Sequence, residues 1–150
     1  DIEKLKNQAL LNPRKRVRFC SHKTPKELVH EMFIVHPQNA YIRPHKHLKK
    51  IESMIVLQGA VDYITFDDQG GISNKISMGE FSSGKIFYNS LRTEIYHTLL
   101  IRSEWLVFLE VTQGPFHKKD AIFAEWSPLD CDTQEVETFV RKINNDVGFE

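Results

Sequence analysis

From about residue 40 to residue 112, short apolar segments follow one another at nearly regular spacing, and this pattern constrains the fold more than any other feature. Polar connections separate the segments, and residues 67–71, Asp-Asp-Gln-Gly-Gly, form a strong turn signal. Such a series predicts antiparallel strands in a sandwich or a barrel. The segments are YIRPHKH, ESMIVLQG, VDYITFD, GISNKISM, GKIFYN, EIYHTLLI and EWLVFLEVT.

The N-terminal part of the chain carries helix signals. Residues 1–10 place apolar side chains at helical spacing, and Pro13 ends this pattern. Residues 24–27, Thr-Pro-Lys-Glu, have the order of an N-cap, a proline at N1 and a capping-box glutamate. We therefore expect a short helix before Pro13 and a second helix that begins at residue 24 and stops at Pro37.

The C-terminal part predicts a last helix. Asp132 and Glu135 begin the pattern, and apolar residues at helical spacing continue it over about 132–147. A length of 150 residues suits one domain with one core. We expect a single domain with a helical segment over about 1–37, a barrel over about 38–128 and this C-terminal helix.

Polar side chains share one face of the first predicted strand. Residues two apart in a strand face the same side, so Tyr41, Arg43, His45 and His47 are expected to point inward together. Inward imidazoles are costly unless they find a partner. A metal ion would pair with both histidines, because neutral imidazole is a common ligand for transition metals.

Two further residues are candidates for the same metal site. Glu52 opens the next strand after a short connection, so its carboxylate is expected to return to the same end of the barrel. His97 alternates with Leu99 and Ile101 in a later strand. Together these residues predict a site for one divalent metal ion on His45, His47, Glu52 and His97, with Zn, Fe, Mn and Ni all suited to the donor set.

A family resemblance supports this prediction. The stretch from His45 to Gly59, HKHLKKIESMIVLQG, matches the first cupin motif HxH-x4-E-x6-G, and His97 takes the place of the second-motif histidine. Arg92-Thr93-Glu94 replace the usual P-x-G before that histidine. The longer pattern resembles the WbuC-type cupin fold metalloproteins from about residue 16 to residue 128. It is carried by YIRPHKHLKKIE, ITFDDQG, IYHTL, FLEVTQGPF and KKDAIFAEWSP.

The resemblance implies a fold and a field of activity. The fold is all-β, a cupin double-stranded β-helix or jelly-roll barrel, with short N-terminal helices and a C-terminal helix. The activity is metal-dependent and directed at a small polar or anionic molecule, with a sugar or sugar-nucleotide intermediate of surface-polysaccharide synthesis as the substrate that the resemblance suggests.

Three functions stay open at this stage. The first is a metal-dependent isomerase or epimerase, in which the metal polarises a carbonyl group and Tyr41 or Glu110 moves the proton. The second is a ligand-binding module without turnover. The third is an Fe(II)-dependent dioxygenase. Whether the protein is an enzyme at all is therefore undecided by its sequence.

Substrate contacts are expected from residues around the barrel mouth. Arg43 either binds an anionic group of the substrate or pairs with Glu110. His22 is expected to reach the mouth from the N-terminal segment. Lys119 lies in the family-like stretch KKDAIFAEW and is a further candidate for substrate binding.

Charge is unevenly distributed along the chain. Residues 1–50 hold 12 Lys and Arg against 4 Asp and Glu, whereas the whole chain holds 20 of each. The basic run at residues 14–18 has no interleaved aromatic residues and no recognition-helix motif, so nucleic acid is not an expected partner. A pocket that attracts an anionic small molecule is the preferred interpretation.

The remaining patterns concern location and assembly. No apolar run approaches the length of a membrane span, and the start of the sequence has no apolar signal core. Cys20 and Cys131 match no metal spacing, and we expect two reduced thiols in a cytoplasmic protein. The strand at residues 52–58 is apolar on both faces, so either the terminal helices or a second copy of the chain should cover its outer side. A homodimer is the expected assembly.

Overall fold

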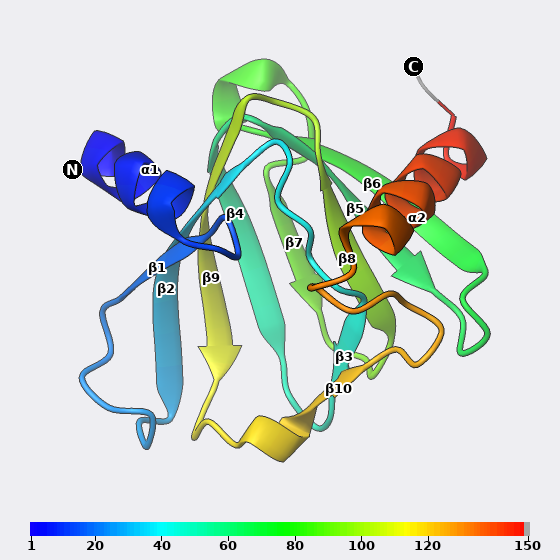
Figure 1. Cartoon of the computed structure of the whole chain (residues 1–150). Coiled ribbons are helices and arrows are strands. Elements are labelled where there is room, and N and C mark those ends of the chain that lie inside the picture. The colour runs from blue at the N-terminus through cyan, green and yellow to red at the C-terminus, as the bar shows by residue number, and fades with distance from the viewer. Residues whose placement is uncertain (149–150) are drawn as a thin grey trace.

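The computed structural model describes residues 1–148 as two five-stranded antiparallel sheets that face each other, with one helix outside each sheet (Figure 1). The first sheet has the order β1 (Val17–Cys20), β2 (Val29–Pro37), β9 (Trp105–Gln113), β4 (Glu52–Gln58) and β7 (Tyr88–Leu91). The second has the order β10 (Ala121–Phe123), β3 (His45–His47), β8 (Tyr96–Ile101), β5 (Ala60–Phe66) and β6 (Ile72–Gly79). This architecture confirms the expected all-β jelly-roll barrel.

Two helices flank the barrel as expected. α1 (Ile2–Leu11) begins at Asp1, whose carboxylate accepts a hydrogen bond from a backbone N–H of the first turn. α2 (Thr133–Asp146) begins at Asp132 in the same way. Two short 3-10 helices, η1 (Phe81–Ser83) and η2 (Lys118–Asp120), lie in connections between strands. Neither α-helix in the described part of the chain combines the length and the apolar character needed to span a bilayer.

The prediction of a second N-terminal helix from residue 24 to Pro37 is wrong. One capping-box hydrogen bond forms, because Glu27 Oε1 accepts from the backbone N–H of Thr24 at 3.0 Å, but Thr24 Oγ1 accepts from Lys26 instead of Glu27, and the segment closes only a turn. Val29–Pro37 is strand β2, which pairs with β9 along its whole length, from Val29 opposite Gln113 to Pro37 opposite Trp105. Pairing with a distant segment therefore overrides the local helix signal.

The barrel consequently begins earlier in the chain than predicted. β1 pairs with β2 from Val17 onward, so residues 17–37 belong to the first sheet and not to a helical segment. The strand expected in GKIFYN lies slightly later, as β7. The three-residue strand β10 closes the edge of the second sheet beside β3.

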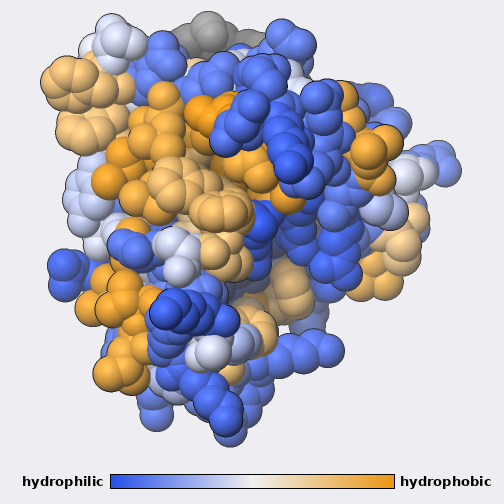
Figure 2. Space-filling view, turned by 90° about the vertical axis from the view of Figure 1, so that its left-hand side faces the viewer, coloured by the Kyte–Doolittle hydropathy of each residue, from blue (hydrophilic) through white to orange (hydrophobic). Residues whose placement is uncertain are grey.

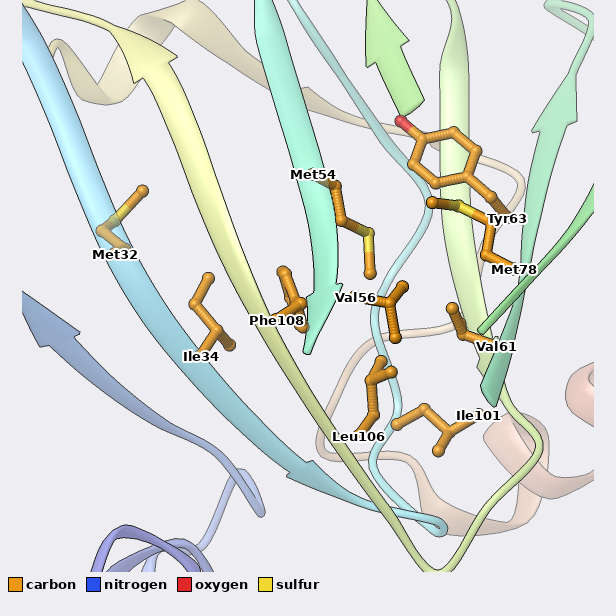
Figure 3. Packing of buried hydrophobic residues seen from close by; sticks show 10 residues of the cluster. All are labelled: Met32, Ile34, Met54, Val56, Val61, Tyr63, Met78, Ile101, Leu106 and Phe108. Carbon is orange, nitrogen blue, oxygen red and sulfur yellow. The ribbon is translucent and has the colours of Figure 1, made fainter. Parts of the chain in front are cut away.

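A hydrophobic core fills the space between the sheets (Figure 3). It combines inward side chains of the first sheet, such as Ile34 and Phe108, with those of the second, such as Val61 and Ile101. All four are buried. Burial of such side chains stabilises each by about 1.5–3 kcal/mol relative to exposure, and it fixes how the two sheets face each other.

The two helices cover different outer faces. α1 packs on the first sheet through Ala9, Val35 and Val107, and α2 packs on the second sheet. Neither cluster includes Leu57 on the outer face of β4, which is 43 % exposed. Figure 2, which views the α1 side, shows hydrophobic residues gathered on this part of the surface. Coverage by a second copy of the chain stays a prediction, which light scattering in solution can test.

Gly59, the last residue of the first cupin motif, joins β4 to β5 with a backbone that only glycine adopts easily. Its φ is +90°, and an added Cβ would lie 2.1 Å from the backbone oxygen of Trp105. We expect Gly59→Ala to lower the free energy of unfolding by more than about 3 kcal/mol, because strain and a backbone clash add. Urea denaturation followed by circular dichroism measures this change.

Gly84 provides the matched control. Its φ is also positive, +73°, but an added Cβ would meet nothing within 4 Å. Gly84→Ala should therefore cost only the backbone strain, about 1–2 kcal/mol. Equal losses in the two variants would contradict the claim that close packing at Gly59 shapes this turn.

Candidate metal centre

The register between β3 and β8 brings three histidines together. His45 on β3 lies directly opposite His97 on β8, and His47 follows two residues later on the same face. The ring centroids of His45 and His97 are 4.6 Å apart, and those of His45 and His47 are 4.9 Å apart. One ligand-type atom of each of the three rings lies within 4.8 Å of the others.

Glu52 completes the cluster from the opposite sheet. It is the first residue of β4, and its Oε2 lies 3.0 Å from His47 Nε2. Its Oε1 lies 3.7 Å from His97 Nε2. The side chain is buried, as is that of His97. Three imidazoles and one carboxylate therefore converge between the two sheets at one end of the core, as the motif predicted.

Backbone carbonyls orient two of the rings. His45 Nδ1 lies 2.9 Å from the carbonyl oxygen of Arg43, and His97 Nδ1 lies 3.1 Å from that of Ile95. With Nδ1–H as the donor in each bond, Nε2 carries the lone pair that a metal requires. The arrangement is the outer-shell support that metal-binding histidines usually have.

Burial also sets the charge state of the cluster. It lowers the pKa of His45 to about 3, helped by the neighbouring His97 and His47, and it lowers the pKa of His97 as well. Burial alone would raise the pKa of Glu52, but the hydrogen bond with His47 and the nearby imidazoles lower it to about 2. The neutral imidazoles of His45 and His97 beside the ionised carboxylate of Glu52 are in the protonation states that bind a divalent cation.

The residues present fit a divalent metal ion. Three nitrogen donors and one oxygen donor suit Zn, Fe, Mn or Ni, and they leave one or two coordination positions for another molecule in a five- or six-coordinate ion. His45, His47, His97 and Glu52 are the residues that would hold it.

A cavity of about 140 Å³ adjoins the cluster inside the barrel. Its wall includes all four candidate ligands and reaches the edge strand of the first sheet, where Arg16 and Arg18 line it. It also includes Tyr63, whose ring stacks on His97 with centroids 5.4 Å apart and whose buried hydroxyl has no hydrogen-bond partner among the described residues. The cluster of candidate ligands thus forms part of a cavity wall and is not enclosed in the packed core.

Two predicted site residues lie elsewhere, because residues 41–44 do not continue strand β3. Pro44 is buried, and Ile42 instead of Arg43 joins the core and the cavity wall. The Arg43 guanidinium donates to Ser127 Oγ at 3.0 Å and to the carbonyl of Ala124 at 2.9 Å, so the proposed pair with Glu110 is not formed. Arg43 thus ties the segment after β10 to the barrel.

Tyr41 likewise points away from the cluster. Its hydroxyl donates to the carbonyl of Pro128 at 3.2 Å, and its ring meets Phe139 of α2 edge-on. It lines a different cavity, of about 620 Å³, between the second sheet and α2. The expected row of four inward polar side chains is therefore wrong in its first two members.

Glu110 lies in the cavity of the cluster, as predicted. Its side chain has no hydrogen bond or ion pair within the described residues, whereas its backbone pairs with β2 and β4. Burial, followed by the charge of Glu52, raises the pKa of Glu110 to about 8. Its carboxyl group therefore holds a proton at neutral pH beside a carboxylate that does not.

The other two predicted substrate residues lie close to the cavity without lining it. His22 stacks on His30 with ring centroids 4.1 Å apart, and His30 forms part of the cavity wall. Lys119 lies in η2 and lines a neighbouring groove of about 430 Å³. That groove shares Lys50 and Asp120 with the cavity, so the two lie side by side.

Tyr63, His30 and His36 also form part of the cavity wall, although no sequence motif marks them. Alternation along β2 could have revealed the two histidines. His30, Met32, Ile34 and His36 are every second residue of the strand, so the histidines share a face with the buried Met32 and Ile34. The helix prediction for this segment hid that signal. Nothing in the sequence singles out the Tyr63 hydroxyl from a packed aromatic ring.

Comparison with solved structures agrees with the fold. SO0799 from Shewanella oneidensis aligns with a TM-score of 0.58 and 7 % identity, over 71 % of this chain and 72 % of that chain. Oxalate decarboxylase from Lactobacillus farciminis, in a formate complex, aligns with a TM-score of 0.55 and 16 % sequence identity, over 72 % of this chain and 30 % of that chain. Oxalate decarboxylase from Bacillus subtilis aligns with a TM-score of 0.56 and 17 % sequence identity, over 72 % of this chain and 27 % of that chain. This chain thus spans less than a third of either decarboxylase.

These comparisons and the structure define the class: the chain is a cupin-fold protein with a cluster of residues suited to a divalent metal. It belongs to the family described as Domain of unknown function (DUF6016), whose model matches residues 1–78. That match includes His45, His47 and Glu52, whereas His97 lies beyond it. No curated protein matches the chain.

His36 generates a prediction about pH. It is 4 % exposed, and burial lowers its pKa to about 4. Between pH 6.5 and 4 the histidine of the unfolded chain, with a pKa near 6.5, is protonated, whereas His36 of the folded chain stays neutral. The free energy of unfolding therefore falls as the pH falls through this window. From pH 7 to pH 5 this residue should remove about 2 kcal/mol from the free energy of unfolding.

Urea denaturation at pH 7 and pH 5 measures this effect, with His36→Phe as the comparison. The variant keeps an aromatic ring against Phe108, which stacks on His36 with centroids 5.9 Å apart. Its loss of stability on acidification should be smaller than that of the wild-type protein by about 2 kcal/mol. The same loss in both proteins would show that His36 is not held neutral.

Proposed function

We propose that this protein is a metal-binding cupin that acts on a small polar molecule, with the metal ion held by His45, His47, His97 and Glu52. One observation carries the proposal. Three imidazoles and a carboxylate converge from opposite sheets, and they do so in the wall of a cavity instead of in a closed core. Structural sites are usually closed, whereas catalytic sites keep a position open.

The metal would supply Lewis-acid chemistry by polarising an oxygen atom of the bound molecule. The donor set suits Fe(II), Mn(II), Ni(II) and Zn(II) alike. The structurally similar oxalate decarboxylase of Bacillus subtilis has Mn(II) centres, which supports Mn(II) as one candidate here.

Glu110 favours a reaction with proton transfer. It lies in the same cavity and carries a proton at neutral pH, because burial and Glu52 raise its pKa to about 8. A carboxylic acid with a pKa near the working pH exchanges a proton efficiently. Isomerisation or epimerisation next to a carbonyl group is the reaction class that uses such a group beside a metal ion.

The same donor set also suits an Fe(II)-dependent dioxygenase. Oxygen consumption by the iron-loaded protein with thiols, diketones and sugars separates the two classes, since an isomerase consumes none. A binding module without turnover would retain a bound ligand unchanged over time, which product analysis can show. Glu110→Gln separates these roles further, because it removes proton transfer and preserves the size of the side chain.

The resemblance to WbuC-type cupins supports a narrower proposal, a sugar or sugar-nucleotide of surface-polysaccharide synthesis as the substrate. The cavity, about 140 Å³, is small for a whole nucleotide sugar. The groove at its mouth, about 430 Å³ and lined by Lys49 and Lys119, offers space for the remainder. A nucleotide sugar would thus place its reacting sugar at the metal and its phosphates in the groove.

Metal content tests the site. Protein purified without a histidine tag and equilibrated with Mn(II) or Zn(II) should contain about one ion per chain by mass spectrometry. The double variant His45→Ala/His47→Ala should fall to background, because it removes two of four ligands. His36→Phe, which removes a histidine outside the cluster, should retain the ion. Wild-type metal content in the double variant would show that the site is wrongly assigned.

A thermal-shift screen tests the substrate. Nucleotide sugars added to the metal-loaded protein at about 100 times their Kd should stabilise it by about 2.7 kcal/mol, a shift of several degrees in Tm. Lys49→Gln and Lys119→Gln should reduce this shift if the phosphates lie in the groove. The absence of a shift with every nucleotide sugar would remove the polysaccharide proposal and leave the metal site standing.

A further inference from the structure

Two arginines line the cavity of the histidine cluster, and neither forms a salt bridge among the described residues. Arg16 and Arg18 flank Val17 at the start of the edge strand β1. Val17 packs outward with the α1 cluster, and Arg16 and Arg18 on either side of it line the cavity, Arg16 half-buried and Arg18 exposed at the rim. Ile34, which lies opposite Arg18 on β2, belongs to the inner core, and this places the same face of the strand pair toward the cavity.

Neither guanidinium has an ion pair within the described residues, even though Glu110 lines the same cavity. Burial lowers the pKa of Arg16, and the charges of Arg18 and Arg14 lower it further, whereas the smaller effects of Asp130 and Glu110 raise it. Arginine stays charged under all ordinary conditions, so repulsion between the two neighbouring guanidinium groups persists. An anion bound between the two side chains would relieve it.

The geometry suits an oxyanion in particular. Arginine offers planar donors that match the paired oxygens of a carboxylate or a phosphate, and charge-assisted bonds of this type are about twice as strong as neutral ones. A partly enclosed position strengthens them further, because solvent screens them less. The basic N-terminal third of the chain adds a field that draws anions to this end.

We propose that Arg16 and Arg18 form an oxyanion subsite that binds the carboxylate or phosphate end of the molecule whose other end reaches the metal ion. The part of this inference that places the other end of the molecule at the metal ion rests on the proposed function. The inference names the substrate class as a molecule with oxygen atoms for the metal cluster and a separate oxyanion for the arginines. In a nucleotide sugar whose phosphates lie in the groove of Lys49 and Lys119, that oxyanion would be a carboxylate of the sugar. The inference also assigns to the arginine pair the anion-binding role that the sequence suggested for Arg43.

Binding of simple anions to the metal-free protein tests the subsite by itself. Malonate and inorganic phosphate serve as the probes, each compared with sodium chloride at equal ionic strength in a thermal-shift titration. The wild-type protein should be stabilised by at least one probe. The stronger of the two identifies a carboxylate or a phosphate as the preferred group.

Three variants make the test specific. Arg16→Met/Arg18→Met should weaken the apparent affinity at least tenfold. Arg14→Met should leave it unchanged, because Arg14 carries the same charge in the same run but does not line the cavity. Arg18→Met alone, at the exposed end of the pair, should give an intermediate loss and serves if the double variant does not fold.

The outcomes separate this inference from the proposed function. Equal losses in Arg14→Met and in the double variant would overturn it, because they would indicate a general charge effect. No stabilisation of the wild-type protein by either anion would overturn it as well. Metal content should be the same in all the arginine variants, so a wild-type protein that binds anions but no metal would refute only the proposed function.

Discussion

The antiparallel pairing of β3 with β8 is the constraint on which the site depends. It sets His45 directly opposite His97, and the two-residue repeat of the strand then adds His47 on the same face. β3 contributes only three residues, and β10 on its other side holds it in place through three paired positions. A slip of one residue would turn both histidines of β3 out of the barrel.

The core and the site divide the interior of the barrel between them. Apolar side chains from both sheets fill one part, and Met54 and Tyr63 mark the end of the packed cluster that lies toward the start of β4 (Figure 3). Glu52 is that start, two residues before Met54 on the same face. The low-dielectric core therefore borders directly on the titratable groups, which explains why burial moves the pKa values of His45 and Glu110 in opposite directions.

Several parts of this arrangement were predictable from local patterns and others were not. His45, His47 and Glu52 follow from spacing within two neighbouring strands, which short-range alternation describes well. The prediction that Arg43 points into the barrel failed because Pro44 interrupts the strand, and alternation cannot be counted across such a break. The segment of β2 was predicted as a helix because a capping box is read from four adjacent residues. The strand partner of this segment, β9, lies about 75 residues later in the chain. Non-local pairing is the information that a single sequence does not display.

The ligand set draws three members from one sheet and the fourth, Glu52, from the other. An ion bound there would cross-link the two layers. Its binding free energy is then shared with the closure of the barrel at that end. Loading with metal would therefore slow proteolysis at this end of the barrel, and the ion would contribute to the persistence of the folded chain as well as to its chemistry.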